Sequence, residues 1–338
     1  IYSPGTYFNN SDSNDTVLSN NTICIWADLS KANSIIKETI ITIGLSIIDI
    51  LTGKIINYQY SHPFINSPTT YDQLEKYIAI YNPSEAIIIS NVEDEDYIDS
   101  LISYANINSQ KIHKIYLNDT VSKNNTNTNN KNSFAKLALN CEKQTYQDMI
   151  IDKYYGIGTF QEKPEFHEYP IANQSICFLI DFIVKHNPNL IKDIELPIFE
   201  NHCDKLVLAN HSLKQLNIIN DNRYNGKLSC VVNFLNNSIT SIGKRKFNYA
   251  LLHPISDINE LNRAYNVTEH IINTQFYHTI RNYLNDIKDI EKFERKLVLK
   301  KIDPKDFFML YNNLEKIFEL FQVISFDKRN KKLYDYIL

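Results

Sequence analysis

The first half of the chain alternates short apolar runs with amphipathic segments. The apolar runs that predict strands are Ile23–Ala27, Thr39–Ile50, Ile55–Tyr60, Ala86–Ile89 and Ile112–Leu117. Apolar residues recur at the three-and-four spacing of a helix in Tyr71–Asn82 and again in Tyr97–Ala105. This alternation of strand and helix signals predicts an α/β domain built around a layered sheet.

After Pro164 the pattern changes to helical periodicity with few strand signals. The segments predicted as helices are Ile171–Lys185, Ile258–Ile272, Tyr277–Leu284, Ile287–Leu299 and Pro304–Phe321. Pro304 occupies a favourable first-turn position, with Asp303 before it as N-cap. The second half is therefore expected to be mostly helical, with one short extended stretch at Lys205–Leu208.

Polar segments divide the chain. Ser3 to Thr6 has the residues of a turn, and residues 9–21 are too hydrophilic to bury, so we expect residues 1–21 to be a linker. Residues 22–163 form the predicted α/β domain and residues 164–338 the helical one. Within the first domain, the asparagine-rich stretch Asn118–Ser133 is expected to be a surface loop. Because the chain begins with Ile1, we expect it to be a piece of a longer protein.

Composition and charge exclude several classes of protein. Hydrophobic residues make up 43% of the chain, but the longest apolar runs are far shorter than the roughly 18 residues that span a membrane. Lys and Arg number 35 against 39 Asp and Glu, so the net charge of −4 gives no general attraction for a phosphate backbone. The five cysteines are widely spaced and form no Cys-x-x-Cys pair, which favours a reducing intracellular compartment over a disulfide framework.

One stretch, residues 239–271, carries an ordered set of motifs. Gly243 and Arg245 follow a threonine, a Leu-x-x-Pro ends at Pro254, an Asp-Ile begins at Asp257, and Arg263 lies on the next predicted helix. This order and spacing closely resemble the core-domain signature of MutS-type DNA mismatch-repair proteins. Gly243 permits a tight turn into a helix, and the guanidinium of Arg245 can form two parallel hydrogen bonds with a carboxylate partner.

Three further stretches agree with the MutS resemblance. The Ser-Pro-Gly-Thr around Gly5 is similar to the end of that family's mismatch-recognition domain. Residues 44–53, which contain Asp49 and Gly53, are similar to the hairpin of its connector domain. The Asp-Ile-Glu-Lys that begins at Asp289, with Arg295 after it, resembles a family helix. The resemblance therefore covers the whole chain in the correct order.

The resemblance implies a fold and a role. It implies a connector domain with an RNase H-like mixed sheet and flanking helices, followed by the first part of a helical core and lever domain. In the family a mismatch-recognition domain precedes this region, and the DNA clamp and the ATPase follow it. The segment would transmit conformational change between DNA-binding and ATPase domains, with no catalysis of its own. Helix register would be held by charged pairs among Arg245, Arg263, Arg295, Asp257 and Asp289.

The implied cofactors and partners belong to the full-length parent. ATP and Mg²⁺ would bind there and not in this segment, where the Gly-Lys pairs at 53, 226 and 243 are followed by Ile, Leu and Arg instead of the Ser or Thr of a phosphate-binding loop. The partners would be mismatched double-stranded DNA through the missing domains, a second MutS-type subunit, and downstream repair factors through the connector domain. A nuclear, cytoplasmic or viral-factory, or mitochondrial location fits equally well, and no membrane is implied.

Two alternatives remain open from the residues alone. One is a metal-dependent RNase H-like nuclease that uses Asp28 and Asp49, since such enzymes bind two Mg²⁺ with clustered carboxylates. The other is a stand-alone interaction module derived from the family. The basic clusters Lys244–Lys246, Lys300–Lys301 and Lys328–Lys332 could each contact phosphate, the last most readily.

Overall fold

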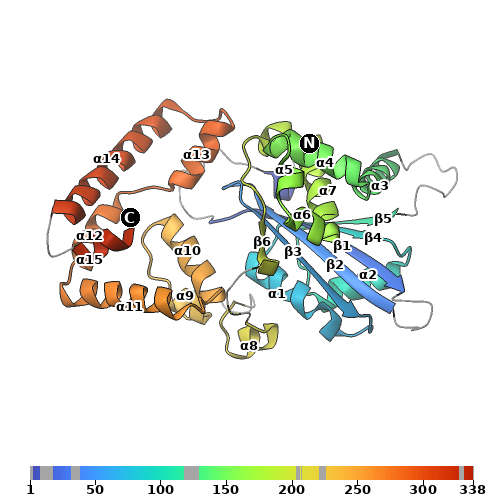
Figure 1. Ribbon diagram of the computed structural model, residues 1–338, viewed down its shortest axis with the longest axis horizontal. Helices are drawn as coiled ribbons and strands as arrows, with labels where there is room; N and C mark the ends of the chain where they lie inside the picture. The colour runs from blue at the N-terminus through green and yellow to red at the C-terminus, as the bar shows by residue number, and fades with distance from the viewer. Residues whose placement is uncertain are drawn as a thin grey trace. The chain divides into compact units, whose positions relative to one another are not determined.

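The computed structural model describes residues 3–7, 18–31, 39–117, 129–202, 206, 208–220, 226–326 and 331–337. The chain forms two compact units, of which the first contains residues 1–9 and 19–203 and the second contains residues 10–18 and 204–338 (Figure 1). The mixed sheet with flanking helices, followed by a mostly helical region, confirms the predicted fold class.

The first unit is built on a six-stranded mixed sheet. Its strands are β1 (Asn21–Lys31), β2 (Thr39–Asp49), β3 (Ile55–Pro63), β4 (Glu85–Ser90), β5 (Lys111–Tyr116) and β6 (Ile198–Phe199). Their order across the sheet is β5-β4-β1-β2-β3-β6. The pairs β1–β2 and β2–β3 are antiparallel, whereas β1–β4, β4–β5 and β3–β6 are parallel. All five predicted strands are present because each is a β-branched or aromatic run bounded by turn residues.

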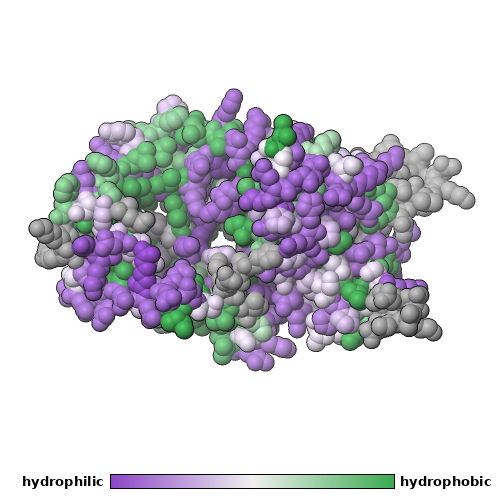
Figure 2. Space-filling model, viewed as in Figure 1, coloured by the Kyte–Doolittle hydropathy of each residue, from purple (hydrophilic) through white to green (hydrophobic). Residues whose placement is uncertain are grey.

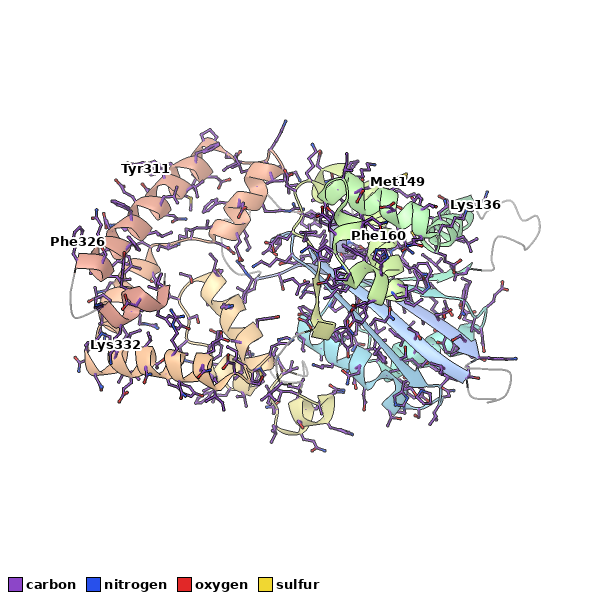
Figure 3. The ribbon with its side chains drawn as sticks, viewed as in Figure 1. Lys136, Met149, Phe160, Tyr311, Phe326 and Lys332 are labelled. Carbon is purple, nitrogen blue, oxygen red and sulfur yellow. The ribbon has the colours of Figure 1, made fainter. Side chains whose placement is uncertain are left out.

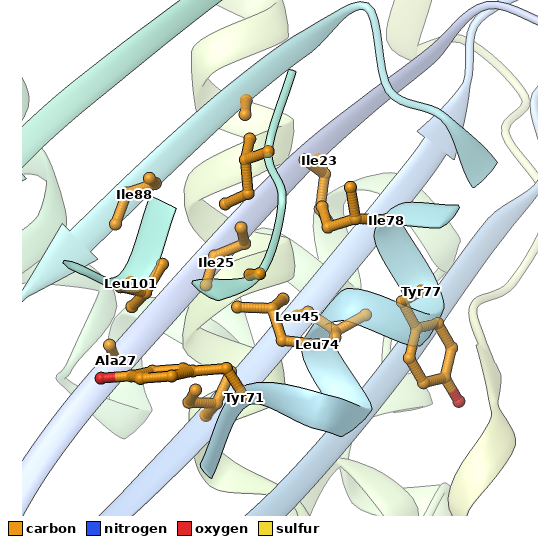
Figure 4. Close-up of a cluster of buried hydrophobic side chains, with 14 of the residues drawn as sticks. Ile23, Ile25, Ala27, Leu45, Tyr71, Leu74, Tyr77, Ile78, Ile88 and Leu101 are labelled. Carbon is orange, nitrogen blue, oxygen red and sulfur yellow. The ribbon is translucent and has the colours of Figure 1, made fainter. Parts of the chain in front are cut away.

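One face of the sheet packs against α1 (Asp72–Tyr81) and α2 (Glu95–Tyr104). Figure 4 shows the core between them, where alternate residues of the strands meet the apolar stripes of the two helices. Ile25 and Leu45 from the sheet lie with Leu74 and Leu101 from the helices, and none of these four side chains is exposed. The regular strand and helix periodicities of the sequence therefore produce one continuous core.

The opposite face packs against α7 (Pro170–His186). The hydroxyl of Ser175 donates to the Cys24 carbonyl (2.7 Å), and that of Ser46 donates to the Ala172 carbonyl (3.2 Å). A Cβ added at Gly44 would lie 2.3 Å from the backbone carbonyl carbon of Ile171, so the helix can approach this closely only over a glycine. This packing extends the first unit to residue 203, past the predicted domain boundary at residue 163.

Smaller helices complete the first unit. They are α3 (Asn129–Cys141), α4 (Gln144–Tyr155), α5 (Thr159–Glu162) and α6 (Glu165–Glu168), with the 3₁₀ turns η1 (Pro4–Thr6), η2 (Pro68–Tyr71), η4 (Pro188–Ile191) and η5 (Glu200–His202). The predicted loop Asn118–Ser133 is wrong at its end, because α3 begins at Asn129, and residues 118–128 lie outside the described residues. The predicted linker also contains a packed part, since Ser3, Gly5 and Thr6 are buried.

The second unit is helical. Its helices are α8 (Asn210–Gln215), α9 (Val231–Leu235), α10 (Ser241–Leu252), α11 (Ile258–Asn273), α12 (Tyr277–Asn285), α13 (Ile290–Val298), α14 (Pro304–Phe326) and α15 (Lys331–Ile337). At the predicted extended stretch, neither Leu206 nor Leu208 belongs to a strand, and the Leu206 amide donates to the Pro254 carbonyl (2.9 Å). Among the described helices, none combines the length and apolar character needed to cross a bilayer.

The long helix α14 carries apolar side chains on both of its sides. One side packs with α11 and α15 around Val267, Ile324 and Leu333. The other side exposes aromatic residues, including Tyr311 (60% exposed) and Phe326 (81%), which Figure 3 labels. Apolar residues are correspondingly gathered over α14 on the surface in Figure 2.

Candidate functional site

The candidate site is a charged cluster in the second unit that joins α10 to α13. The guanidinium of Arg245 donates from Nη1 to Oδ2 of Asp289 and from Nη2 to Oδ1, both at 2.7 Å. Its Nε donates to Oε2 of Glu291 (3.0 Å), and its Nη2 also pairs with Glu291. A further bond runs from Nη1 to the Leu18 carbonyl (3.2 Å). One arginine thus ties together two helices and the chain segment ahead of β1.

Local sequence positions the arginine. Thr240 is the N-cap of α10, and its Oγ1 accepts from the Gly243 amide (3.1 Å). A Cβ at Gly243 would lie 2.9 Å from that oxygen, so the glycine gives room for the cap. This corrects its predicted role, because Gly243 lies inside the first turn of α10 and does not form a tight turn before it. Pro254 lies two residues beyond Leu252, the last residue of this helix.

The cluster is largely shielded from water. The side chain of Arg245 is 16% exposed and that of Asp289 is 3% exposed. Burial alone would lower the pKa of Arg245, but the hydrogen bonds and negative charges of Asp289 and Glu291 outweigh it and raise the pKa. The arginine therefore remains charged, and removing either side of the pair would leave a charge without its partner in a poorly solvated place.

The other predicted charged residues act differently. Asp257 caps α11 by accepting from the Asn259 amide (2.8 Å). Arg263 was expected to pair with a carboxylate, but it donates to the backbone carbonyl of Asp335 (2.7 Å) and lies over the Tyr336 ring (5.2 Å). It therefore joins α11 to α15 by a carbonyl and a cation–π contact. Arg295 is buried near the end of α13, 3% exposed.

Sequence reasoning missed one buried ion pair. Nζ of Lys296 on α13 lies 3.1 Å from Oδ2 and 3.3 Å from Oδ1 of Asp306 on α14. Oδ2 of Asp306 also accepts from the Asp303 amide (3.3 Å), at the start of α14. In the sequence this pair shows only as an acidic residue, Asp306, in the first turn of one helix and a lysine, Lys296, on the helix before it. That pattern is too common to predict a specific ion pair.

In the first unit the predicted residues shape turns. The Asp49 carboxylate accepts from the amides of Asn20 (2.9 Å) and Leu51 (3.0 Å) and from the hydroxyl of Thr52 (2.8 Å). Gly53 has φ +79° and donates its amide to the Asp49 carbonyl (2.7 Å), a left-handed position that favours glycine. Asp49 and Gly53 therefore close the β2–β3 hairpin.

The register of β1 and β2 contradicts the nuclease alternative. Asp28 pairs with Thr42, whereas Asp49 pairs with Asn21 at the other end of the same two strands. Seven residues of β1 separate the two levels, which at the rise of a strand is about 23 Å, far more than a shared metal site allows. Asp28 instead accepts from the Asn91 side chain (2.6 Å). Within the described ranges no group of three or more His, Cys, Asp or Glu side chains could hold a metal ion.

Two of the Gly-Lys pairs in the sequence can be placed in the structure. Gly53 lies in a hairpin turn and Gly243 inside a helix, so neither belongs to a glycine-rich loop that opens a helix. The basic cluster at 328–332 is described only in part, with Lys331 and Lys332 exposed on α15.

The chain is similar to known DNA mismatch-repair proteins over most of its length. Residues 211–336 match the family MutS domain III. A mutS homolog for DNA mismatch repair from Acanthamoeba polyphaga mimivirus is 26% identical over 96% of this chain and 29% of its own length. The DNA mismatch repair protein MutS of Caldanaerobacter subterraneus subsp. tengcongensis is 23% identical over 96% of this chain and 32% of its own length. A mitochondrial mutS homolog of Sarcophyton glaucum is 26% identical over 52% of this chain and 20% of its own length.

The fold defines a protein with a mixed α/β sheet followed by a helical region that contains a buried charged cluster. The comparisons support a MutS-type DNA mismatch-repair protein, over a stretch that includes the connector domain. The chain spans about a third or less of the length of these relatives.

Proposed function

We propose that this chain is the part of a DNA mismatch-recognition ATPase that transmits conformational change between its DNA-binding and ATPase domains. The observation that carries the proposal is the Arg245 cluster. It links α10, α13 and residue 18 through one side chain, so these segments are held as one body. A rigid body can carry a displacement from one end to the other, as transmission requires.

The second buried ion pair supports the same role. Lys296 and Asp306 fix the end of α13 to the start of α14, immediately beyond the Arg245 cluster along the chain. Charged pairs of this kind have a narrow geometric optimum, so helices that they join favour one register over neighbouring ones. The helical unit then responds to force by moving its helices together.

The chain itself catalyses nothing in this proposal. ATP and Mg²⁺ act in the full-length parent, whose DNA partner is mismatched double-stranded DNA bound through other domains. We further propose that the parent pairs with a second MutS-type subunit, that the connector region meets downstream repair factors, and that the protein acts in a reducing intracellular compartment. The basic residues Lys331 and Lys332 are candidates for a weak phosphate contact.

The test uses the full-length parent that contains this chain. Allosteric coupling is measured as the ratio of affinities for mismatched DNA with and without nucleotide, which is typically about 5- to 150-fold in coupled systems. With Arg245→Met we expect this ratio to fall toward one, while ATP hydrolysis and mismatch binding are each retained. The matched control is Arg281→Met, because Arg281 is exposed and donates to a backbone carbonyl, that of Asn237 (3.2 Å). An unchanged ratio in a folded Arg245→Met protein would refute the proposal.

A further inference from the structure

The turn that precedes β1 is held on the sheet by one buried carboxylate. Glu85 is the first residue of β4 and is not exposed at all. Its Oε2 accepts from the Gly5 amide (3.0 Å), and its Oε1 lies 2.7 Å from Nε2 of His113. Because an ionised carboxylate can only accept, Nε2 of His113 donates in this pair.

The remaining attachments of the turn are also polar. The hydroxyl of Thr22 on β1 donates to the Gly5 carbonyl (2.9 Å), and Nδ2 of Asn20 donates to the Pro4 carbonyl (3.2 Å). A Cβ at Gly5 would lie 2.2 Å from the Thr22 hydroxyl, so only glycine fits here. The buried residues of the turn are Ser3, Gly5 and Thr6, and none of them has a large apolar side chain. The turn is thus fixed by hydrogen bonds and contributes little to the apolar core.

His113 is itself held from two sides. It lies on β5, and its ring meets the Phe182 ring of α7 edge-on, with centroids 5.2 Å apart. The imidazole is therefore positioned by the sheet and by α7 independently of the turn.

We propose that Ser3–Thr6 is a releasable latch, which detaches from the sheet as a unit while the sheet remains folded. Glu85 holds the latch closed by accepting the hydrogen bond from the Gly5 amide. Elements open separately from the whole when they add few buried apolar contacts, and this turn meets that condition. Its role rests on the proposed function. When the latch is closed, a displacement of the preceding chain is transmitted directly to β1 and β4. When the latch is open, the preceding chain can move without displacing these strands.

The test is amide hydrogen exchange on the 338-residue chain. In the native protein the Gly5 amide should exchange faster than those of Ile87 and Ile89 in the central strand β4. Glu85→Gln should speed Gly5 exchange by about tenfold or more, since hydrogen bonds to charged groups are the stronger ones, and Thr22→Val by about fivefold. Thr42→Val is the matched control, because the Thr42 side chain shares a hydrogen bond with the exposed Ser61 hydroxyl (2.9 Å), far from the turn. It should change neither site. In Glu85→Gln and Thr22→Val the Gly5 amide should accelerate by a larger factor than the β4 amides, which report opening of the whole unit.

The latch is refuted if Gly5 exchanges at the same rate as the β4 amides, or if both accelerate together in Thr22→Val. If Glu85→Gln unfolds the first unit, the amides of β1 will also lose their protection from exchange. In that case Thr22→Val alone tests whether the turn opens separately from the sheet. The measurement needs neither DNA nor nucleotide. Its failure is therefore distinguishable from failure of the proposed function, which is read from nucleotide-dependent DNA affinity.

Discussion

Arg245 and Asp289 meet end to end, with two parallel hydrogen bonds of 2.7 Å between guanidinium and carboxylate. The two residues are 44 positions apart in the chain: Arg245 lies on α10, and Asp289 is the N-cap residue of α13. Such a two-pronged pair fixes orientation as well as distance, which a lysine could not do. It is the main electrostatic link between α10 and α13 among the described contacts.

Breaking this pair should destabilise the helical unit. Arg245→Met and Asp289→Asn should each lower the free energy of unfolding by about 3 kcal/mol, because each leaves a poorly solvated charge without its partner. The double variant should cost clearly less than the sum, as measured by urea unfolding in a double-mutant cycle. Arg281→Met, at an exposed site, should stay within about 0.5 kcal/mol of the wild type. Simple additivity of the two changes would contradict the pairing.

Packing of α7 on the sheet depends on Gly44. In Gly44→Ala the new methyl group would lie 2.3 Å from the Ile171 backbone, so the helix must move away from β2. We expect a loss of about 3 kcal/mol in the stability of the first unit, the upper end of the cost of overpacking. The midpoint of urea unfolding measures it, with Ser61→Ala, at an exposed position of β3, as the comparison. A Gly44→Ala midpoint equal to that of Ser61→Ala would show that α7 does not pack this closely.

Acid should weaken the first unit through Glu85. Burial raises the pKa of this carboxyl, but hydrogen bonds from His113, Ser3 and Gly5 outweigh it, so the pKa lies below its ordinary value of 4.5. A lowered pKa means that the unfolded chain binds the proton more readily, so the stabilisation is present above the ordinary pKa and is lost as pH falls through the native one. Urea unfolding from about pH 6 to about pH 3 should therefore show the wild type losing its advantage over Glu85→Gln. Other buried carboxyls are common to both proteins and cancel in the difference. An advantage that grew on acidification would reverse the assigned sign.

The thiol of Cys24 should be unreactive toward alkylating reagents in the native protein. Cys24 on β1 is fully buried, and burial raises the pKa of its thiol to about 12, with a smaller opposing effect of Ser175. Since the thiolate is the reactive form, iodoacetamide should label Cys24 in the native chain far more slowly than in urea. Mass spectrometry of the Cys24 peptide measures both rates. Comparable rates in the two conditions would show that β1 is accessible.

The sequence predicted much of this protein where the physical rule is local. The spacing of apolar side chains predicts a strand at Ile23–Ala27 and a helix at Leu74–Tyr81. Pro304 and Asp257 mark the starts of helices because their side chains suit the first positions of a helix. The sequence also named both Arg245 and Asp289 as members of charged pairs, because the motifs that resemble the MutS family contain one residue each.

Tertiary structure decided what depends on distance between remote segments. Whether Asp28 and Asp49 lie together is set by strand register, which places them at opposite ends of β1 and β2. Whether α7 belongs with the sheet or with the later helices depends on the close approach over Gly44, and neither segment reveals this alone. The partners of Arg263 and Lys296 were likewise fixed only by helix packing, because a charged side chain on a helix carries no mark of which of many opposite charges or carbonyls it will face.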